Sequence, residues 1–185
     1  DCLGRLGSGG PVTICCGPGN NGGDGYVIAR HLDLRGQAVR VLVWCSPDRI
    51  QGDAAINYRI LKASGVPLEH LGDAADLAAR LAGSAWVVDA LLGTGSQGEP
   101  RSPLDAVIAA INASGVPALA VDLPSGLDCD TGRPASHTIR AAHTCTFVAL
   151  KRGFLTPAAR PYLGVLHVID IGAPRALVKE YTGQE

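Results

Sequence analysis

Residues 11–35 read PVTICCGPGNNGGDGYVIARHLDLR, and the fold class can be predicted from them. It begins with an apolar run, Pro11–Cys16, which predicts a buried strand. Five of the nine residues from 17 to 25 are glycine, and Gly25–Arg35 then carries apolar side chains at helical spacing. A strand, a glycine-rich turn and a helix in this order are typical of the first unit of a doubly wound α/β domain.

The rest of the chain repeats this alternation of short apolar runs and amphipathic segments. Such spacing calls for parallel strands with helices on both faces. The near-continuous apolar character of the runs fits strands that are buried on both sides. We therefore expect residues 1–185 to form a single domain, a Rossmann-like three-layer α/β/α sandwich with a mostly parallel central sheet. The further predicted strands are Ala38–Trp44, Ala85–Leu92, Ala118–Leu123, Thr144–Leu150 and Val165–Ile171, and the further predicted helices are Asp53–Ser64, Asp73–Ala82 with Asp73 as N-cap, and Pro103–Ala113.

Composition narrows the classes of function. Hydrophobic residues make up 46% of the chain and charged residues 18%, which is ordinary for a globular domain. A net charge of −1 provides no field for gathering nucleic acid or an anionic membrane, and no apolar run is long enough to span a bilayer. The six cysteines form no C-x-x-C pair, and four lie in strand-like runs, which favours buried free thiols. We therefore expect a cytoplasmic protein with no nucleic-acid or membrane partner.

The loop Gly17–Gly25 predicts a phosphate-binding site. Dense glycine lets a ligand approach the backbone closely, and the N–H groups of the following helix favour an anion. Asn20 and Asn21 add amide groups that can hydrogen-bond a ligand or coordinate a hard cation. A plain strand-to-helix turn, with Asp24 as a helix cap, is the simpler alternative, but it does not explain the density of glycine.

The same loop meets only half of the dinucleotide fingerprint. Gly17, Gly19 and Gly22 satisfy G-x-G-x-x-G, but the fingerprint also requires an acidic residue at the end of the second strand. Asp48 lies late and follows a proline. The absence of G-K-[ST] after the glycines excludes a P-loop.

Two further predicted strands end in acidic residues followed by glycine and hydroxyl residues. Asp89 precedes the segment 93–96, Gly-Thr-Gly-Ser, whose N–H groups could form a second anion cradle. Asp122 precedes Ser125 and Gly126. Each aspartate alone is explained by capping of nearby N–H groups, but the two together favour a shared site, in which a bound hard cation would relieve their repulsion. Lys151 and Arg152 end the fifth predicted strand and are interpreted as a solvated surface pair.

These three loops resemble the signature loops of the NAD(P)H-hydrate epimerases, the YjeF N-terminal domain family. The resemblance rests on the segments 19–25 (GNNGGDG), 88–95 (VDALLGTG) and 121–128 (VDLPSGLD), with 170–174 (DIGAP) similar to the last strand of the family. It covers roughly Val12 to Pro174 and keeps all the motifs in order. Three long motifs in order are far more specific than one glycine loop.

The resemblance implies an activity and a set of site residues. The activity is interconversion of the R and S epimers of hydrated NADH or NADPH, an isomerase reaction in repair of nicotinamide cofactors. Asp122 matches the catalytic candidate, and Asn21, Asp89 and Ser125 match the ligands of one potassium ion per subunit. The implied substrate-binding residues are Asn20, Asn21, Gly22, Gly23, Asp24, Gly93, Thr94, Gly95, Ser96, Gln97, Gly98, Glu99 and Asp122.

The resemblance also implies partners, and it leaves rival functions open. A homodimer and a dehydratase, fused or separate, are expected. Family members carry a helical segment before the first strand, whereas here only Asp1–Gly10 precede it and the chain has no methionine, so we expect the natural protein to begin earlier. The rivals are a non-catalytic dimerisation module of the kind found in messenger-RNA decapping scaffolds, and an NAD(P)-dependent oxidoreductase.

Overall fold

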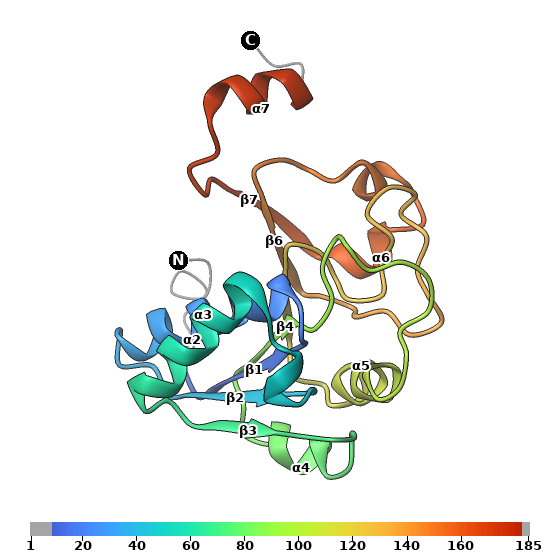
Figure 1. The fold of residues 1–185 in the computed structure, drawn as a ribbon. Helices are drawn as coiled ribbons and strands as arrows, with labels where there is room; N and C mark the ends of the chain where they lie inside the picture. The colour runs from blue at the N-terminus through green and yellow to red at the C-terminus, as the bar shows by residue number, and fades with distance from the viewer. Residues whose placement is uncertain (1–8, 183–185) are drawn as a thin grey trace.

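A parallel sheet organises the chain in the computed structural model, which describes residues 9–182 (Figure 1). Its seven strands lie in the order β3-β2-β1-β4-β5-β6-β7, and all six strand pairings are parallel. The strands are β1 (Val12–Cys16), β2 (Val39–Val43), β3 (Leu68–His70), β4 (Trp86–Ala90), β5 (Ala118–Val121), β6 (His143–Phe147) and β7 (Val165–Ile169). The sheet predicted as mostly parallel is therefore wholly parallel among the described residues.

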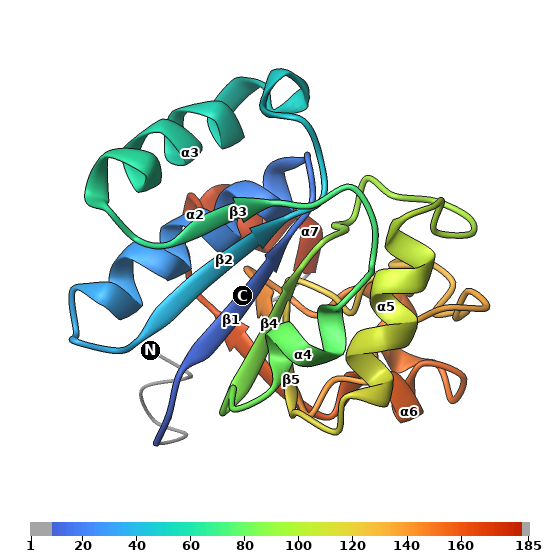
Figure 2. The same ribbon diagram turned by 90° about the horizontal axis from the view of Figure 1, so that it is seen from below.

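Helices cover both faces of the sheet, as Figure 2 shows, so the predicted three-layer fold is confirmed. Successive residues of a strand point to opposite faces. Ile14 therefore packs in one core with α2 and α3, whereas Cys15 packs in the other with α4 and α5. The helices are α2 (Asn20–Asp33), α3 (Gly52–Ser64), α4 (Leu77–Leu81), α5 (Leu104–Ala113), α6 (Arg160–Leu163) and α7 (Arg175–Thr182), with 3-10 turns η1 (Pro47–Arg49) and η2 (Arg152–Leu155).

The strand order changes direction at the centre of the sheet. From β1 the chain moves outward to β2 and β3, then returns to the other side of β1 with β4 and continues to β7. In such sheets the loops that leave the carboxyl ends of the two central strands separate and open a crevice for a ligand. Here these are the loops after β1 and β4, which both carry predicted site motifs.

Several predicted boundaries were wrong. The first helix begins at Asn20 rather than Gly25, so the second half of the glycine-rich segment is helical. The helix predicted at Asp73–Ala82 shrinks to α4, because Asp73 instead accepts the Ala75 N–H in a turn and Asp76 adopts a left-handed conformation with φ 55°. The short edge strand β3 was not predicted, since three residues leave no readable alternation.

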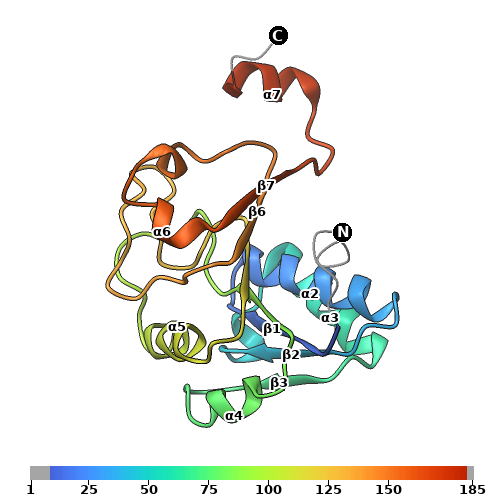
Figure 3. The same ribbon diagram turned by 180° about the vertical axis from the view of Figure 1, so that it is seen from behind.

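The two last predicted strands end early. β6 stops at Phe147 because Val148 adopts a positive φ of 68°, and β7 stops at Ile169. Beyond it α7 stands away from the sheet (Figures 1 and 3). Cys15, Cys16, Cys45 and Cys145 are buried, as expected, and none of them forms a disulfide with another described residue, while Cys2 lies outside the described residues. None of the described helices is long and apolar enough to cross a membrane.

Candidate functional site

A cavity of about 580 Å³ lies at the carboxyl ends of β1, β4 and β5, and we call it the strand-end cavity. Its walls come from the N-terminal turns of α2, the loop after β4 and the residue after β5. Three loops that the sequence predicted as functional therefore meet at one place. The lining residues are Pro18, Gly19, Asn20, Asn21, Asp24, Leu91, Leu92, Gly93, Thr94, Gly95, Ser96 and Asp122.

The glycines of the first loop let α2 approach the sheet, and none of those from 17 to 25 has a positive φ. A Cβ at Gly17 would lie 1.9 Å from the carbonyl oxygen of Leu91, and a Cβ at Gly22 would lie 2.1 Å from that of Gly17. At Gly25 a Cβ would lie 2.6 Å from the Cys16 sulfur. The glycines thus serve close packing, which brings the helix N-terminus and its N–H groups to the cavity.

Asp122 is held at the cavity wall through one of its two carboxylate oxygens. The residue follows β5 in a left-handed conformation with φ 66°. Its Oδ1 accepts the Phe147 N–H at 3.1 Å and the Thr146 hydroxyl at 3.3 Å, and lies 2.7 Å from the Lys151 Nζ. No described residue donates a hydrogen bond to Oδ2. The carboxyl is therefore fixed in place with one oxygen left for a ligand.

The prediction that Lys151 is a solvated surface residue was wrong. Its side chain is only 20% exposed, and its ammonium donates to the Phe147 carbonyl as well as pairing with Asp122. Neighbouring Arg152 is exposed, as predicted. Since β5 and β6 are adjacent, the chain just beyond β6 runs beside the end of β5, and this adjacency of consecutive strands is the signal that could have revealed the pair.

The second carboxyl of the strand-end cavity is that of Asp24, on the second turn of α2. Burial, and then the negative charge of Asp122, raise the pKa of Asp24 to about 6. The two side chains line the same cavity from different elements. The sequence had instead paired Asp122 with Asp89, which is fully buried and does not line the strand-end cavity.

Asp89 lies beneath the loop after β4, where it binds Ser125. Its Oδ1 accepts the Ser125 hydroxyl at 2.6 Å, and its Oδ2 accepts the Ser125 N–H at 2.8 Å. Asn21 reaches the same place from α2 and donates its amide to the Leu92 carbonyl at 2.9 Å, while the Leu92 N–H donates to the Ser125 hydroxyl. Asn21, Asp89 and Ser125 are all buried and gather around Leu92.

This cluster suits a hard cation by its donor set. The atoms that could coordinate a cation are carboxylate, hydroxyl, amide and carbonyl oxygens from three elements of the fold. Burial raises the pKa of the Asp89 carboxyl to about 6, although hydrogen bonds from Ser125 and Leu91 oppose this shift. No cationic side chain among residues 9–182 forms a salt bridge with Asp89. A buried carboxylate without a counter-charge is costly, and a bound cation would remove that cost.

The loop after β4 departs in part from expectation. The predicted anion cradle at Gly93–Ser96 contains no left-handed residue, and the Ser96 N–H closes a turn onto the Gly93 carbonyl. Five predicted substrate-binding residues do not line the strand-end cavity: Gly22 and Gly23 are buried against neighbouring backbone, Gln97 is exposed, and Gly98 and Glu99 lie further along the loop.

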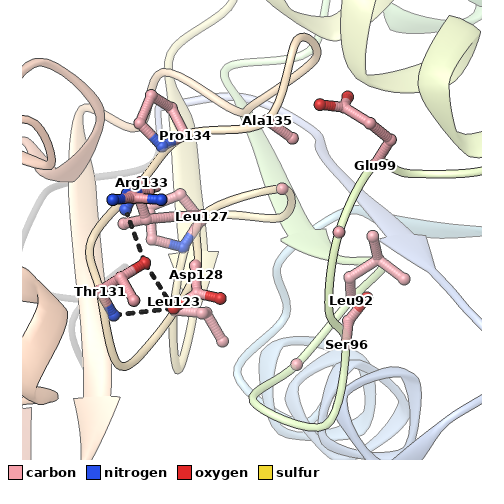
Figure 4. Close-up of a pocket in the computed structure, with 14 residues that line it drawn as sticks. Leu92, Ser96, Glu99, Leu123, Leu127, Asp128, Thr131, Arg133, Pro134 and Ala135 are labelled. Carbon is pink, nitrogen blue, oxygen red and sulfur yellow. Dashed lines mark hydrogen bonds between the residues drawn. The ribbon is translucent and has the colours of Figure 1, made fainter.

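Gly98 and Glu99 line a second cavity of about 310 Å³, on the other side of the same loop (Figure 4). The figure shows Leu92, Ser96 and Glu99 on one wall, and Asp128, Thr131 and Arg133 on the facing wall. The Asp128 carboxylate accepts the Thr131 hydroxyl at 2.9 Å, which orders that wall. Leu92, Gly93 and Ser96 border both cavities, so the loop separates two compartments of one larger site.

Fold and site together define a Rossmann-like α/β protein that binds a small ligand at the carboxyl edge of its sheet. Residues 4–153 match the family described as YjeF-related protein N-terminus, and the chain belongs to this family.

Its relatives carry names that bear on the activity. The chain is 51% identical over 172 residues to the NAD(P)H-hydrate epimerase of Pirellula staleyi, covering 91% of this chain and 76% of that protein. It is 43% identical to the bifunctional NAD(P)H-hydrate repair enzyme Nnr of Pyrobaculum aerophilum, covering 88% of this chain and 33% of that protein. The crystal structure of yeast ynu0, YNL200c, superposes with a TM-score of 0.79 at 25% identity, covering 96% of this chain and 73% of the yeast chain.

Proposed function

We propose that this chain interconverts the R and S epimers of hydrated NADH and NADPH. The proposal rests on the arrangement of the Asp122 carboxyl. One of its oxygens is held by Phe147 and Lys151, and the other is left for a ligand in a cavity that the N-terminus of α2 also lines. A helix N-terminus favours the phosphate groups of a dinucleotide, and a positioned carboxyl can exchange protons with a hydroxyl. The names of the 51% and 43% identical relatives support this choice of substrate.

The two cavities suit the two halves of such a substrate. The hydrated ring would lie in the strand-end cavity beside Asp122, with the diphosphate near Asn20 and Gly19. The adenosine half would pass the loop after β4 into the second cavity, where Leu127 and Pro134 offer apolar surface. A dinucleotide that spans both compartments uses remote contacts to hold the reacting carbon in place.

The chemistry requires proton exchange at one hydroxyl. The hydrated carbon bears this hydroxyl and neighbours the ring nitrogen, so loss of water gives an iminium ion, and water that returns to the opposite face inverts the centre. A carboxyl that lies beside the hydroxyl can donate and accept the protons of these steps. A negative carboxylate also stabilises the positive ring.

Potassium is the cation that we propose for the cluster of Asn21, Asp89 and Ser125. The bound ion would order the loops after β1, β4 and β5, which together carry the lining of the strand-end cavity. It supplies charge and order, and the proton exchange stays with the carboxyls.

Potassium is expected to stabilise the native chain against heat. At about ten times its dissociation constant a ligand adds about 1.4 kcal/mol, which in a domain of this size raises Tm by roughly 3–6 °C. Thermal unfolding is compared in potassium chloride and in tetramethylammonium chloride at equal ionic strength. Asn21→Ala should lose the response, because it removes an oxygen from the cluster, whereas Asn20→Ala should keep it. An equal Tm in both salts would contradict the site.

The decisive assay is incubation of the chain with each purified epimer of the hydrate. We expect the chain to convert either epimer alone to the same mixture of both, faster than the reaction without protein. Chromatographic separation of the epimers measures this conversion. A non-catalytic module would bind the hydrate and leave the epimer unchanged. An oxidoreductase would instead alter the nicotinamide absorbance, and Asp48, the acidic residue that this alternative needs, lies in η1 outside the strand-end cavity.

We also propose that the chain acts as a homodimer and works beside a dehydratase that consumes one epimer. The bifunctional relatives, of which the matched part is about a third, support a linked second activity. Sedimentation equilibrium tests the dimer directly.

A further inference from the structure

The two carboxyls of the strand-end cavity have different surroundings. Asp122 contacts a cation, Lys151, at 2.7 Å and accepts two further hydrogen bonds on the same oxygen. Asp24 lies on α2, accepts no hydrogen bond from any described residue, and is partly buried beside the charge of Asp122. Two like charges in one cavity favour a single shared proton, and the contacts decide which carboxyl carries it.

Building on the proposed function, we propose that Lys151 makes this pair unequal, so that Asp24 carries the proton that leaves with the hydroxyl and Asp122 receives one from the incoming water. The pair thereby supplies an acid and a base from two different elements of the fold, α2 and the turn after β5. Lys151 is a positioning residue, which acts through the Asp122 carboxylate.

The proposed step balances. The carbon–oxygen bond of the hydrate breaks with its electron pair going to oxygen, the Asp24 proton goes to that oxygen, and the ring nitrogen lone pair forms the carbon–nitrogen double bond. Water then adds to the other face of that carbon, the double-bond electrons return to nitrogen, and the Asp122 carboxylate takes the surplus proton. The hydrate is neutral again, and one proton has moved from Asp24 to Asp122.

Lys151 also explains how the pair resets. Once Asp122 is protonated, the charge attraction between Asp122 and the Lys151 ammonium is lost. Transfer of that proton to Asp24 restores the attraction. The proton therefore returns to Asp24 before the next turnover. The same contacts allow the reverse reaction from the switched state.

Few other charged groups face the pair. Along the cavities that Asp24 borders, the remaining titratable or charged side chains are His31 and Arg35, further along α2, and the Cys145 thiol on β6. None of these lines the strand-end cavity itself. Lys151 is thus the cation that a substitution must remove to equalise the carboxyls.

The test follows the carboxyl carbons by NMR in protein labelled at aspartate. In the native chain the Asp24 signal should report binding of a proton at about pH 6. In Lys151→Met both signals should move together, and the first proton should bind at higher pH, since the pair has lost its cation. Asp24→Asn and Asp122→Asn assign the two signals.

Matched variants separate charge from structure. Lys151→Arg should restore the native titration, and Arg152→Met, which removes the neighbouring exposed cation, should leave it unchanged. If Lys151→Met does not fold, Asp122→Asn supplies the second measurement, because loss of the Asp122 charge should lower the pH at which Asp24 titrates. An unchanged titration of Asp24 in Asp122→Asn, or parallel titration of both carboxyls in the native chain, overturns the inference.

Turnover gives the functional result. Lys151→Met should lower kcat on the order of a hundredfold with little change in KM, and should move the acidic limb of the pH profile upward, which a purely structural role would not do. If the native chain epimerises and Lys151→Met keeps its rate and pH profile, only this inference fails. If the native chain does not epimerise the hydrate at all, the proposed function fails and the inference with it.

Discussion

Asp122→Asn is expected to abolish epimerisation while the fold stays intact. The amide keeps the size of the carboxyl and can still accept the Phe147 N–H, and asparagine tolerates the left-handed conformation that this position requires. The amide cannot take up a proton, however, and it no longer pairs with Lys151. Removal of a positioned acid–base group reduces rates by about 10²–10⁴-fold, so kcat should fall by at least that lower figure.

The control for this substitution is Asp33→Asn, an equal loss of charge on the exposed end of α2. It should retain native kcat. Thermal unfolding of Asp122→Asn should stay cooperative at a lower Tm, since Lys151, which is only 20% exposed, loses its charged partner. Near-native turnover of the folded Asp122→Asn chain would remove this carboxyl from the mechanism.

The sequence predicted that three loops meet at one edge of the sheet, and this was possible because the ends of buried parallel strands can be recognised in a sequence. Each of three predicted apolar runs contains an observed strand, namely Pro11–Cys16, Ala85–Leu92 and Ala118–Leu123. Residues of the loops that follow these strands meet in one cavity. This follows from topology alone, since the carboxyl ends of parallel strands share an edge. The assignment of individual residues to substrate or to potassium remains a prediction.

Partnerships between side chains were harder to predict. The sequence pairs Asp122 with Asp89, because both residues lie at strand ends, whereas the carboxyl that shares the cavity with Asp122 is that of Asp24. Asp89 points under the loop to Ser125 instead. Successive residues of a strand face opposite ways, so a shift of one position decides between cavity and core. Lys151 was missed for a related reason, since a lysine at a strand end is usually solvated.

The start of α2 shows a second limit. The sequence predicts a loop at Asn20–Asp24 because of its low helix propensity, since glycine costs about 1 kcal/mol in a helix relative to alanine. In the structure this cost is outweighed by packing that only glycine permits, for example at Gly23, where a Cβ would lie 3.0 Å from the Ala54 Cα on α3. Propensity describes an isolated segment, and the tertiary contacts of α2 override it.

Gly22→Ala should therefore destabilise the domain, although alanine is the better helix former. A Cβ at position 22 would lie 2.1 Å from the Gly17 carbonyl oxygen and 3.0 Å from its carbon, and backbone cannot move aside as a side chain can. Overpacking costs about 1–3 kcal/mol and sometimes more, and so short a contact with backbone belongs at the upper end of that range. After the gain of about 1 kcal/mol in helix propensity, a net loss of about 2 kcal/mol is expected. Gly19→Ala is the matched control, because no atom lies within 4 Å of its Cβ.

The expected result is a Tm lowered by roughly 4–8 °C in Gly22→Ala, given about 2–4 °C per kcal/mol in a domain of this size, and a near-native Tm in Gly19→Ala. Turnover should fall further than stability, because relief of the clash pushes the N-terminus of α2 away from the loop after β1. The helix carries Asp24 on its second turn, and a displacement of about 1 Å at a reacting group can cost about a hundredfold in rate. Thermal unfolding and the epimerisation rate are measured on both variants. A Gly22→Ala chain with native Tm and native rate would show that glycine is not required for α2 to pack against the sheet.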